Sequence, residues 1–320
     1  MSEVAILGAG AWGIALAIQA ARAGRRVELW ARDPVRAAEL RSRREGLRLP
    51  GCRLPDPVAV LDVLPARADI VLLAVPVQFI RTVLTRLPPA AGTLVACCKG
   101  MEAGTLRFPL EVVAECQPRA AAAVLSGPNF AHEIARGLPA AAVVAASDAT
   151  LREQVSAALS TPSFRLYGSA DPLGAQIGGA AKNVIAIAAG VVSGAQLGEN
   201  ARAALVTRGL AELARLAQAL GARAETVMGL SCLGDLLLTC TGERSRNFSL
   251  GAALGRGERL AEILAGRTTV AEGVATAPAL LARAAGTDLP ICRAVAQLLA
   301  SELTVEGAVA ALLGRPRRDE

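Results

Sequence analysis

Short runs of strand length alternate with helical patterns through the first half of the chain. These runs are apolar for most of their length, and they occupy residues 4–7, 26–30, 69–74, 93–98, 121–125, 140–146 and 163–166. Helical spacing covers residues 12–23 and 33–44, and Asp33-Pro34 supplies an N-cap and a first-turn proline for the second helix. Because continuous apolar strands separated by helices are typical of parallel sheets covered on both faces, we expect an α/β domain with a mostly parallel sheet.

The pattern changes near residue 170, where the strand-like runs stop. Segments rich in Ala, Leu and Gly with helical spacing follow, at residues 174–193, 200–219, 247–255, 258–264, 274–285, 290–300 and 304–313. The chain has 320 residues, which is enough for two domains of about 150 residues each. We therefore predict a sheet domain over residues 1–170, followed by an all-helical domain over residues 171–320.

A glycine-rich motif stands between the first strand and the first helix. Gly8, Gly10 and Gly13 form a GxGxxG pattern, with Ala11 and Trp12 in the turn that opens the helix. The first glycine permits a tight turn, the second lets the backbone approach a pyrophosphate, and the third allows close packing of helix against strand. Free N–H groups at the helix N-terminus favour phosphate. This position predicts a Rossmann-type NAD(P)-binding domain over residues 1–170, rather than a purely structural glycine turn.

The end of the second strand bears on which dinucleotide binds. NAD-specific sites usually carry an acidic residue there, whereas this strand is followed by Ala31-Arg32. Arg32 can pair with the 2′-phosphate of NADP, stack on adenine, or remain an ordinary solvated arginine. Asp33 lies beside it at the cofactor end, but a helix cap explains it better. We expect NADP as the cofactor, with NADPH preferred and NAD possible.

Lysine is almost absent from this chain, and its two positions therefore draw attention. Of 34 basic residues only Lys99 and Lys182 are lysines, which indicates that arginine serves wherever charge alone is needed. A buried lysine can give up its proton near neutral pH, whereas an arginine cannot. Lys182 lies in a helical segment with small residues before it and branched apolar residues after it, which leaves room for a substrate and favours an acid–base role. The alternative is a residual surface lysine.

Composition excludes several other classes of protein. Aromatic residues make up 2% and the net charge is +6 without a polybasic tract, so a nucleic-acid partner is disfavoured. Seven cysteines occur without a CxxC pair and His132 is the only histidine, so neither a disulfide framework nor a metal site is expected. The uncharged stretch over residues 4–21 is broken by glycines. We expect a cytoplasmic protein without a membrane span.

The sequence resembles the soluble NAD(P)-dependent glycerol-3-phosphate dehydrogenases of bacteria nearly from end to end. The motifs that carry this resemblance are GAGAWGIALA at 8–17, LPGCRLPDPV at 49–58, AVPVQ at 74–78, CCKG at 97–100, SGPNFAHE at 126–133, AAKNVIAIAAG at 180–190, TRGLAEL at 207–213, GLSCLGDLLLTCT at 229–241, SRN at 245–247 and VAEG at 270–273. So many matches in order make coincidence implausible.

The resemblance implies roles for residues at matching positions. It implies that Lys182 is the general acid/base, with Asp235 and Thr239 beside it in the catalytic group; their spacing of four places both on one helical face. The implied substrate-binding residues are Lys99, Gly127, Asn129, Lys182, Asp235, Ser245, Arg246 and Asn247. The implied cofactor-binding residues, besides Gly8, Gly10, Ala11, Trp12, Gly13, Arg32 and Asp33, are Lys99, Ala131, Arg246, Val270 and Glu272.

The segment around Arg246 also supports an anion site. Arg246 and Asn247 follow a polar turn and precede an apolar helical segment that begins at Phe248, so backbone N–H groups there can face the same anion as the arginine. The alternative is a capping turn with a solvated arginine. Two positions depart from the family pattern: Asn129 stands where Ser or Thr is more frequent, and His132 stands where Lys or Arg is usual. We interpret His132 as a helix-surface residue.

Two other functions remain open at this point. A β-hydroxyacid dehydrogenase has the same construction, but its asparagine four residues after the lysine is replaced here by Ala186. A redox-sensing Rossmann protein without catalysis needs neither a titratable lysine nor an anion site. The resemblance instead implies reversible reduction of dihydroxyacetone phosphate to sn-glycerol 3-phosphate for phospholipid biosynthesis, by a cytoplasmic homodimer.

Overall fold

The chain divides into two compact units. The structure, a computed structural model, describes residues 3–89, 92–242, 245–266, 271–284 and 286–316. The first unit comprises residues 1–99 and 107–176, and the second comprises residues 100–106 and 177–320. The short segment 100–106 thus belongs to the second unit, although the sequence on both sides of it belongs to the first.

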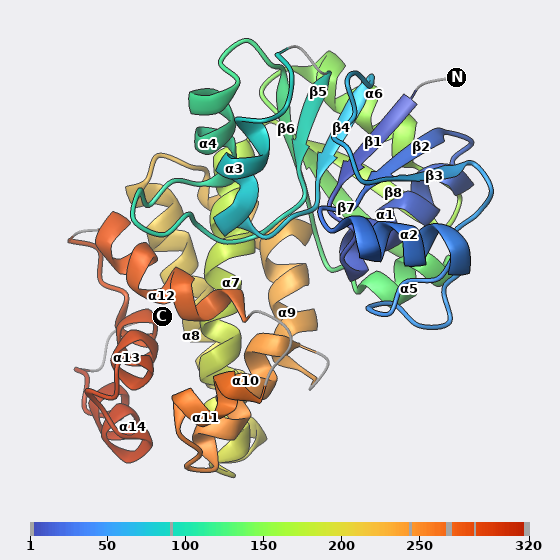
Figure 1. The fold of residues 1–320 in the computed structure, drawn as a ribbon. Coiled ribbons are helices and arrows are strands. Elements are labelled where there is room, and N and C mark those ends of the chain that lie inside the picture. Colours follow the sequence, from blue (N-terminus) through green and yellow to red (C-terminus); the bar gives the residue numbers. More distant parts are fainter. Residues whose placement is uncertain (1–2, 90–91, 243–244, 267–270, 285, 317–320) are drawn as a thin grey trace. The chain divides into compact units, whose positions relative to one another are not determined.

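An eight-stranded sheet forms the centre of the first unit, with strand order β3-β2-β1-β4-β5-β6-β7-β8 (Figure 1). The strands are β1 (Glu3–Leu7), β2 (Arg26–Trp30), β3 (Val58–Leu61), β4 (Ile70–Leu73), β5 (Thr93–Ala96), β6 (Ala122–Ser126), β7 (Ala140–Ala145) and β8 (Phe164–Ser169). Neighbouring strands run parallel except for β6 and β7. The strand order reverses between β1 and β4, which is the position where Rossmann-type sheets bind ligands. The predicted α/β fold with a mostly parallel sheet is confirmed.

Helices cover both faces of this sheet. They are α1 (Ala11–Arg22), α2 (Pro34–Arg43), α3 (Ile80–Leu84), α4 (Pro109–Cys116), α5 (Ala131–Arg136) and α6 (Ala149–Leu159), with a 3₁₀ turn η1 at Val77–Phe79. One core contains apolar residues of α1, α2, α5 and α6, and the other contains those of α3 and α4. Alternate residues of the strands feed the two cores, which explains why the strands read as continuous apolar runs.

Two features of the sheet differ from the expectation or go beyond it. The strand β3 is missing from the predicted set, because it is a four-residue edge strand whose burial alternates and whose flanks carry Pro55 and Pro57. The antiparallel pairing of β6 with β7 leaves no trace in the apolar pattern, since β7 is as apolar as the parallel strand β4. Pairing direction depends on how the connecting segment returns, and periodicity does not record that.

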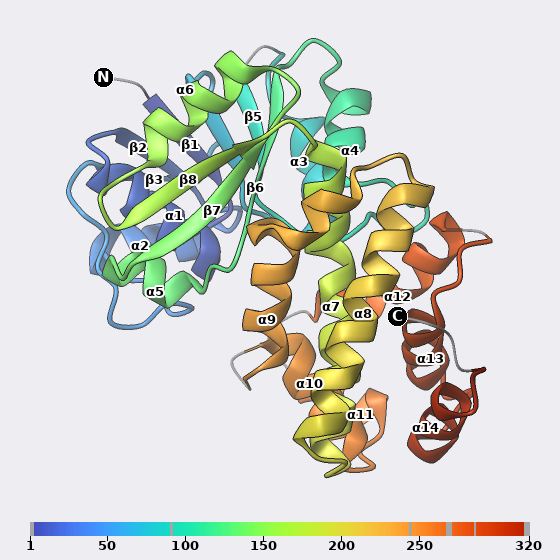
Figure 2. The same cartoon turned by 180° about the vertical axis from the view of Figure 1, so that it is seen from behind.

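The second unit contains helices and no strand among its described residues, which confirms the predicted all-helical part (Figure 2). Its elements are α7 (Pro172–Gly194), whose first residues belong to the first unit, α8 (Glu199–Ala219), η2 (Ala224–Met228), η3 (Leu230–Gly234), α9 (Asp235–Cys240), α10 (Arg246–Gly255), α11 (Leu260–Ala265), α12 (Glu272–Arg283), α13 (Pro290–Leu299) and α14 (Val305–Leu313). The short helix α9 was not among the helices predicted from spacing. Only the four-residue interval between Asp235 and Thr239 indicated a helical face there.

The helix α7 forms the centre of the second unit. It is long and apolar enough to cross a membrane by length and composition, but 89% of its most apolar window is buried, as in the core helix of a soluble protein. Close approach of backbones explains its glycines: a Cβ on Gly190 would lie 2.1 Å from the carbonyl oxygen of Phe248, and one on Gly251 of α10 would lie 2.0 Å from that of Ile187. Small residues thus let α7 and α10 pack with their backbones nearly in contact.

A buried carboxylate caps another helix of this unit. Glu212 of α8 is 1% exposed, and its oxygens accept hydrogen bonds from the backbone N–H groups of Ile291 at 2.6 Å and Cys292 at 3.2 Å. These N–H groups lie in the first turn of α13, where a helix has no internal acceptors and its dipole favours negative charge. Burial is the largest effect on Glu212 and raises its pKa, while the two backbone hydrogen bonds oppose the shift.

Candidate active site

The glycine-rich loop of the first unit has the geometry of a pyrophosphate site. Gly8 adopts φ +118°, and a Cβ there would lie 3.0 Å from the backbone of Ala74 just after β4. A Cβ on Gly13 would lie 1.8 Å from the carbonyl oxygen of Gly8, so helix and strand pack too closely for a side chain. At Gly10, the N-cap of α1, a Cβ would have no neighbour within 4 Å. The loop therefore leaves open space beside the first turn of α1, which begins at Ala11, and these residues fit a dinucleotide.

Trp12 connects this loop to the next candidate residue. Its indole Nε1 donates a hydrogen bond to the carbonyl oxygen of Cys97 at 3.1 Å, just beyond the end of β5. Two residues further on, Lys99 Nζ donates to the carbonyl oxygen of Gly127 at 3.1 Å. The structure thus brings Lys99 and Gly127 together at the carboxyl ends of two parallel strands, β5 and β6. Both residues were predicted from the sequence, but their contact was not.

At the end of β2 the guanidinium of Arg32 lies over the ring of Phe79, 5.5 Å from its centroid. Both side chains are exposed. Asp33 is the N-cap of α2: its Oδ1 accepts from the N–H of Val35 at 3.0 Å, as expected of a cap, and Arg36 lies 3.6 Å from its other oxygen. Sequence reasoning missed Phe79, although its place just after the AVPVQ motif, where η1 follows β4, was a usable signal.

The turn after β6 holds three further predicted positions. Asn129 lies in the loop, Ala131 is the first residue of α5, and His132 follows it in the first turn. The His132 side chain is 37% exposed, lies 3.5 Å from Glu133 and stacks on Phe130 with ring centroids 5.9 Å apart. These contacts agree with its interpretation as a helix-surface residue.

In the second unit a buried lysine is held by two side chains of another helix. Lys182 of α7 is 6% exposed, and its Nζ donates to Asp235 Oδ1 at 2.6 Å and to Thr239 Oγ1 at 2.9 Å. Thr239 Oγ1 in turn donates to the backbone carbonyl oxygen of Asp235 at 2.5 Å, which orients its lone pairs towards the ammonium. The prediction that Asp235 and Thr239 share one helical face is confirmed by α9. The carboxylate, only 2% exposed, compensates the buried positive charge.

A close helix contact sets the register of this cluster. A Cβ on Gly178 would lie 2.5 Å from the Cβ of Cys232, so α7 and the π-helical turn η3 meet there without a side chain between them. Gly178 lies one turn before Lys182 on the same face, and Cys232 lies three residues before Asp235. The contact therefore places lysine opposite carboxylate. Cys232 occupies the room that Gly178 leaves, so this glycine serves helix packing rather than ligand space.

Two cysteines border the cluster and stay protonated. Burial raises the pKa of Cys232 to about 12, with the Asp235 charge adding to the shift and Lys182 opposing it. Burial also raises the pKa of Cys240 to about 12. Because neither thiol ionises near neutral pH, both behave as small apolar neighbours, and Asp235 supplies the negative charge that faces Lys182.

The predicted anion site lies at the start of α10. Ser245 is the N-cap, and its Oγ accepts from the N–H of Phe248 at 3.2 Å. Arg246 is the first helical residue and is exposed. Ser245 thus caps the helix and Arg246 is exposed, which fits both an anion site and a capping turn with a solvated arginine, so the anion site stays a prediction. Arg246 and the first N–H groups of α10 lie in one turn.

Asn247 has contacts that the sequence did not indicate. It is buried, its Nδ2 donates to Asn183 Oδ1 at 2.9 Å, and its Oδ1 accepts from the N–H of Gly273 at 3.0 Å. Asn247 thus joins α10 to α7, next to Lys182, and to the first turn of α12, which begins at Glu272. Sequence reasoning passed over Asn183, although a buried amide directly after the candidate lysine was a signal. Val270, the remaining predicted cofactor residue, lies outside the described residues.

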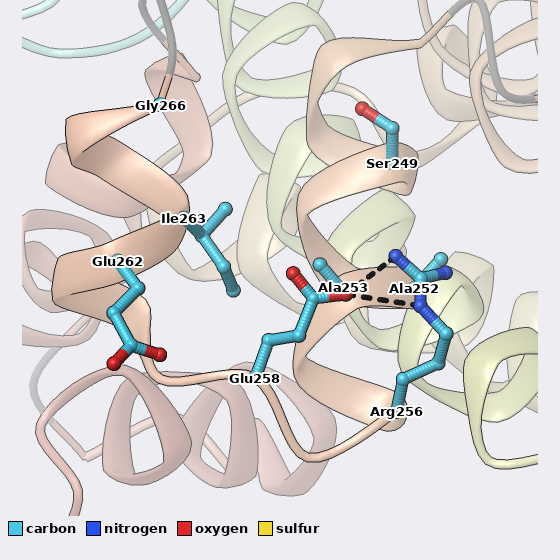
Figure 3. Close-up of a pocket in the computed structure, with 8 residues that line it drawn as sticks. All are labelled: Ser249, Ala252, Ala253, Arg256, Glu258, Glu262, Ile263 and Gly266. Atoms are coloured by element: carbon cyan, nitrogen blue, oxygen red, sulfur yellow. Dashed lines mark hydrogen bonds and ion pairs between the residues drawn. The ribbon is translucent and has the colours of Figure 1, made fainter.

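A hollow of about 390 Å³ lies elsewhere in the second unit, between α10 and α11 (Figure 3). Arg256 and Glu258 both line it, and Arg256 Nε and Nη2 donate to Glu258 Oε1 at 3.0 and 2.8 Å. None of the predicted site residues lines it. In the part of the chain that the structure describes, no group of three or more His, Cys, Asp or Glu side chains could hold a metal ion.

A glycine loop at the switch point of a parallel sheet, together with a buried lysine held by a carboxylate, defines a nicotinamide-dependent dehydrogenase. Comparison with known proteins identifies which one. Residues 3–152 match the family model of the NAD-dependent glycerol-3-phosphate dehydrogenase N-terminus, and residues 171–310 match that of its C-terminus. The chain belongs to the NAD-dependent glycerol-3-phosphate dehydrogenase family, which confirms the resemblance and decides against both alternative functions.

Curated relatives and a solved structure agree with this assignment. The chain is 54% identical to a glycerol-3-phosphate dehydrogenase [NAD(P)+] of Bradyrhizobium sp. (strain BTAi1), over 99% of this chain and 98% of the relative. It is 52% identical to the enzyme of that name from Gluconobacter oxydans, over 98% and 97%. The crystal structure of glycerol-3-phosphate dehydrogenase from Coxiella burnetii has a TM-score of 0.93 at 36% identity, over 98% of this chain and 99% of that chain.

Proposed function

We propose that Lys182 is the proton donor and acceptor in the reversible reduction of dihydroxyacetone phosphate to sn-glycerol 3-phosphate. The observation that carries this proposal is the buried cluster of Lys182 with Asp235 and Thr239. In the direction of reduction, the Lys182 ammonium donates a proton to the oxygen of the substrate carbonyl, which becomes the hydroxyl of the product. In the reverse direction the neutral amine takes that proton back. The nicotinamide of the bound cofactor supplies or accepts the hydride.

Asp235 and Thr239 serve this step by fixing the position of the lysine. The carboxylate offsets the buried charge, and the threonine hydroxyl is already oriented by its bond to the helix backbone. Neither group has to rearrange when the proton leaves. A preorganised donor at the oxygen where charge develops is the most effective electrostatic arrangement for carbonyl reduction.

The substrate phosphate is proposed to bind Arg246 and the first N–H groups of α10. Ser245 caps that helix, and Asn247 holds it against α7, so both support the anion site through the backbone. The amide of Asn247 has further hydrogen-bonding capacity for substrate. Gly127, Asn129 and Lys99 form the substrate-binding group of the first unit, gathered by the contact of Lys99 with the Gly127 carbonyl.

For the cofactor we propose NADPH in preference to NADH. The Gly8–Gly13 loop and the first turn of α1, with Ala11 and Trp12, fit the pyrophosphate. Arg32 supplies a positive charge for the 2′-phosphate, held over Phe79, while both oxygens of Asp33 already have partners. Further proposed contacts are Lys99, Ala131, Arg246, Val270 and Glu272.

The physiological setting is proposed on the resemblance alone. The family resemblance supports a cytoplasmic homodimer that supplies glycerol 3-phosphate to phospholipid synthesis.

Substitution of Lys182 tests the proton-transfer role directly. Lys182→Ala is expected to lower kcat by about 10²–10⁴-fold, the usual range for a positioned acid–base group, with cofactor affinity changed by only a few-fold. Lys182→Arg keeps the charge but holds its proton, so it is expected to fail as well. Nearly full activity of Lys182→Arg would contradict the role. The ratio of kcat/KM for NADPH and NADH with dihydroxyacetone phosphate, measured on the same preparations, tests the cofactor preference.

A further inference from the structure

Two buried polar atoms at the carboxyl end of β6 have no hydrogen-bond partner among the described residues. One is Oγ of Ser126, the last residue of β6, which is only 4% exposed. The other is Oδ1 of Asn129, three residues later in the following loop. The sequence resemblance assigns Asn129 to the substrate, but it assigns nothing to Ser126.

A buried hydroxyl without a partner is unfavourable, so its position calls for an explanation. Leaving such a group unpaired costs about 1–3 kcal/mol, and native structures contain few of them. The rest of β6, Ala122–Leu125, is apolar, and the strand is paired on both sides, by β5 and β7. An alanine or valine would complete this strand without the penalty. The serine stands only where the strand reaches the edge at which such sheets bind ligands.

The surroundings of Ser126 belong to the proposed substrate site. Gly127 follows it directly, and its carbonyl oxygen accepts the hydrogen bond from Lys99 Nζ at 3.1 Å. Gly127 has φ +152°, and a Cβ there would lie 2.9 Å from the Cα of Ala142, so the turn is held tightly against β7. A rigid turn therefore holds Ser126 and Asn129 within two residues of Gly127, the residue that Lys99 contacts.

We propose that Ser126 is a further substrate-binding residue. Its hydroxyl and Oδ1 of Asn129 together bind the free hydroxymethyl group of the three-carbon substrate. A hydroxyl ligand satisfies both atoms, because it can accept from Ser126 Oγ and donate to Asn129 Oδ1. A phosphate dianion cannot satisfy both atoms, because it offers only acceptor oxygens and the amide oxygen of Asn129 is itself an acceptor. The neutral pair thus suits the end of the substrate opposite its phosphate. This inference rests on the proposed assignment of Lys99 and Asn129 to the substrate.

The test compares Ser126→Ala with a matched control, Ser169→Ala. Ser169 is also the last residue of a strand in this sheet, but it ends β8, and its Oγ accepts from the N–H of Asp171 at 3.2 Å. Each variant and the parent enzyme are measured in two ways. One is the melting temperature of the ligand-free enzyme. The other is kcat/KM with dihydroxyacetone phosphate and with hydroxyacetone phosphate, in which a hydrogen replaces the free hydroxyl.

The two variants are expected to behave in opposite ways. Removing an unpaired hydroxyl leaves the melting temperature of Ser126→Ala equal to that of the parent or higher. One lost neutral hydrogen bond lowers its kcat/KM for dihydroxyacetone phosphate about 3- to 10-fold. Its kcat/KM for hydroxyacetone phosphate stays unchanged, so the preference for the hydroxylated substrate shrinks by the same factor. Ser169→Ala loses a bond within the protein, so it melts earlier and keeps both kinetic constants.

Three results would overturn the proposal. A lower melting temperature of ligand-free Ser126→Ala would show that the hydroxyl has a partner within the protein. Equal losses of kcat/KM for both substrates would show that Ser126 does not bind the hydroxymethyl group. A change confined to the NADPH dissociation constant would assign the hydroxyl to the cofactor. Failure of the proposed function would appear separately, as retained activity in Lys182→Arg, whatever Ser126→Ala shows.

Discussion

Removing the carboxylate of Asp235 is expected to destabilise the ligand-free enzyme strongly. Lys182 Nζ lies 2.6 Å from this carboxylate, and the two side chains are 7% and 2% exposed. Asp235→Ala leaves the ammonium buried without its counter-charge, and breaking such a pair from one side costs about 3–5 kcal/mol. Thr239 cannot replace the carboxylate, because a neutral hydroxyl offers only part of the electrostatic compensation. Water is largely excluded at this depth, so solvent does not screen the loss.

The double variant Lys182→Met/Asp235→Leu separates charge from packing. It replaces both charges by apolar side chains of similar size, and exchange of a complete buried pair in this way is often neutral or stabilising. Urea unfolding of the ligand-free parent, Asp235→Ala, Lys182→Met and the double variant gives the four corners of a double-mutant cycle. The two single variants are expected to lose several kcal/mol each, and the double variant much less than their sum. Because ligand-free stability is measured, the loss of activity in all three variants does not matter.

Additive losses would refute this reasoning. If the double variant lost the sum of the two single losses, Lys182 and Asp235 would not be coupled, and Asp235 would not be the residue that positions the lysine. Asp235→Asn provides a second measurement if Asp235→Ala does not fold, since the amide keeps the volume and one acceptor oxygen. Its stability is expected to lie between those of the parent and Asp235→Ala, and its kcat is expected to fall at least tenfold.

Further predictions concern the two phosphate sites and the buried carboxylate of α8. Arg32→Ala is expected to raise KM for NADPH relative to NADH by about 10- to 150-fold, the equivalent of a charge-assisted contact. Phe79→Leu should shift that ratio by only about 2- to 5-fold, since a cation–π contact at an exposed site is weaker; an effect equal to that of Arg32→Ala would mean that Phe79 does more than hold the arginine. Arg246→Ala should reduce the preference for dihydroxyacetone phosphate over dihydroxyacetone at least tenfold, and an unchanged preference would place the phosphate elsewhere. The pKa of Glu212 is raised above 4.5 in the folded state, so its contribution to folding stability is complete below about pH 4.5 and is lost as pH rises through the folded pKa. Between pH 4 and 7 the melting temperature of Glu212→Gln should therefore fall less than that of the parent enzyme.

The sequence by itself determined the features that repeat locally along the chain. Burial on two faces produces continuous apolar strands, so the α/β unit and the change to helices could be predicted without contacts between distant residues. The glycine motif was equally accessible, because the positive φ of Gly8 and the contact of Gly13 with the carbonyl oxygen of Gly8 both arise within one strand–turn–helix element. Lys182 could be singled out because arginine replaces lysine almost everywhere else. Its partners Asp235 and Thr239 came from the family resemblance, and a four-residue spacing explained why they act together.

Only the tertiary structure decided how residues far apart in the sequence meet. The contact of Gly178 with Cys232 brings Lys182 opposite Asp235, yet the residues are more than fifty positions apart, and nothing in either segment records the other. The same holds for Arg32 over Phe79 and for Glu212 at the start of α13. Ser126 shows this most clearly, because only the packed structure reveals that its buried hydroxyl has no hydrogen-bond partner among the described residues. Periodicity reports whether a side chain is buried, but the identity of its neighbours depends on the packing of the whole unit.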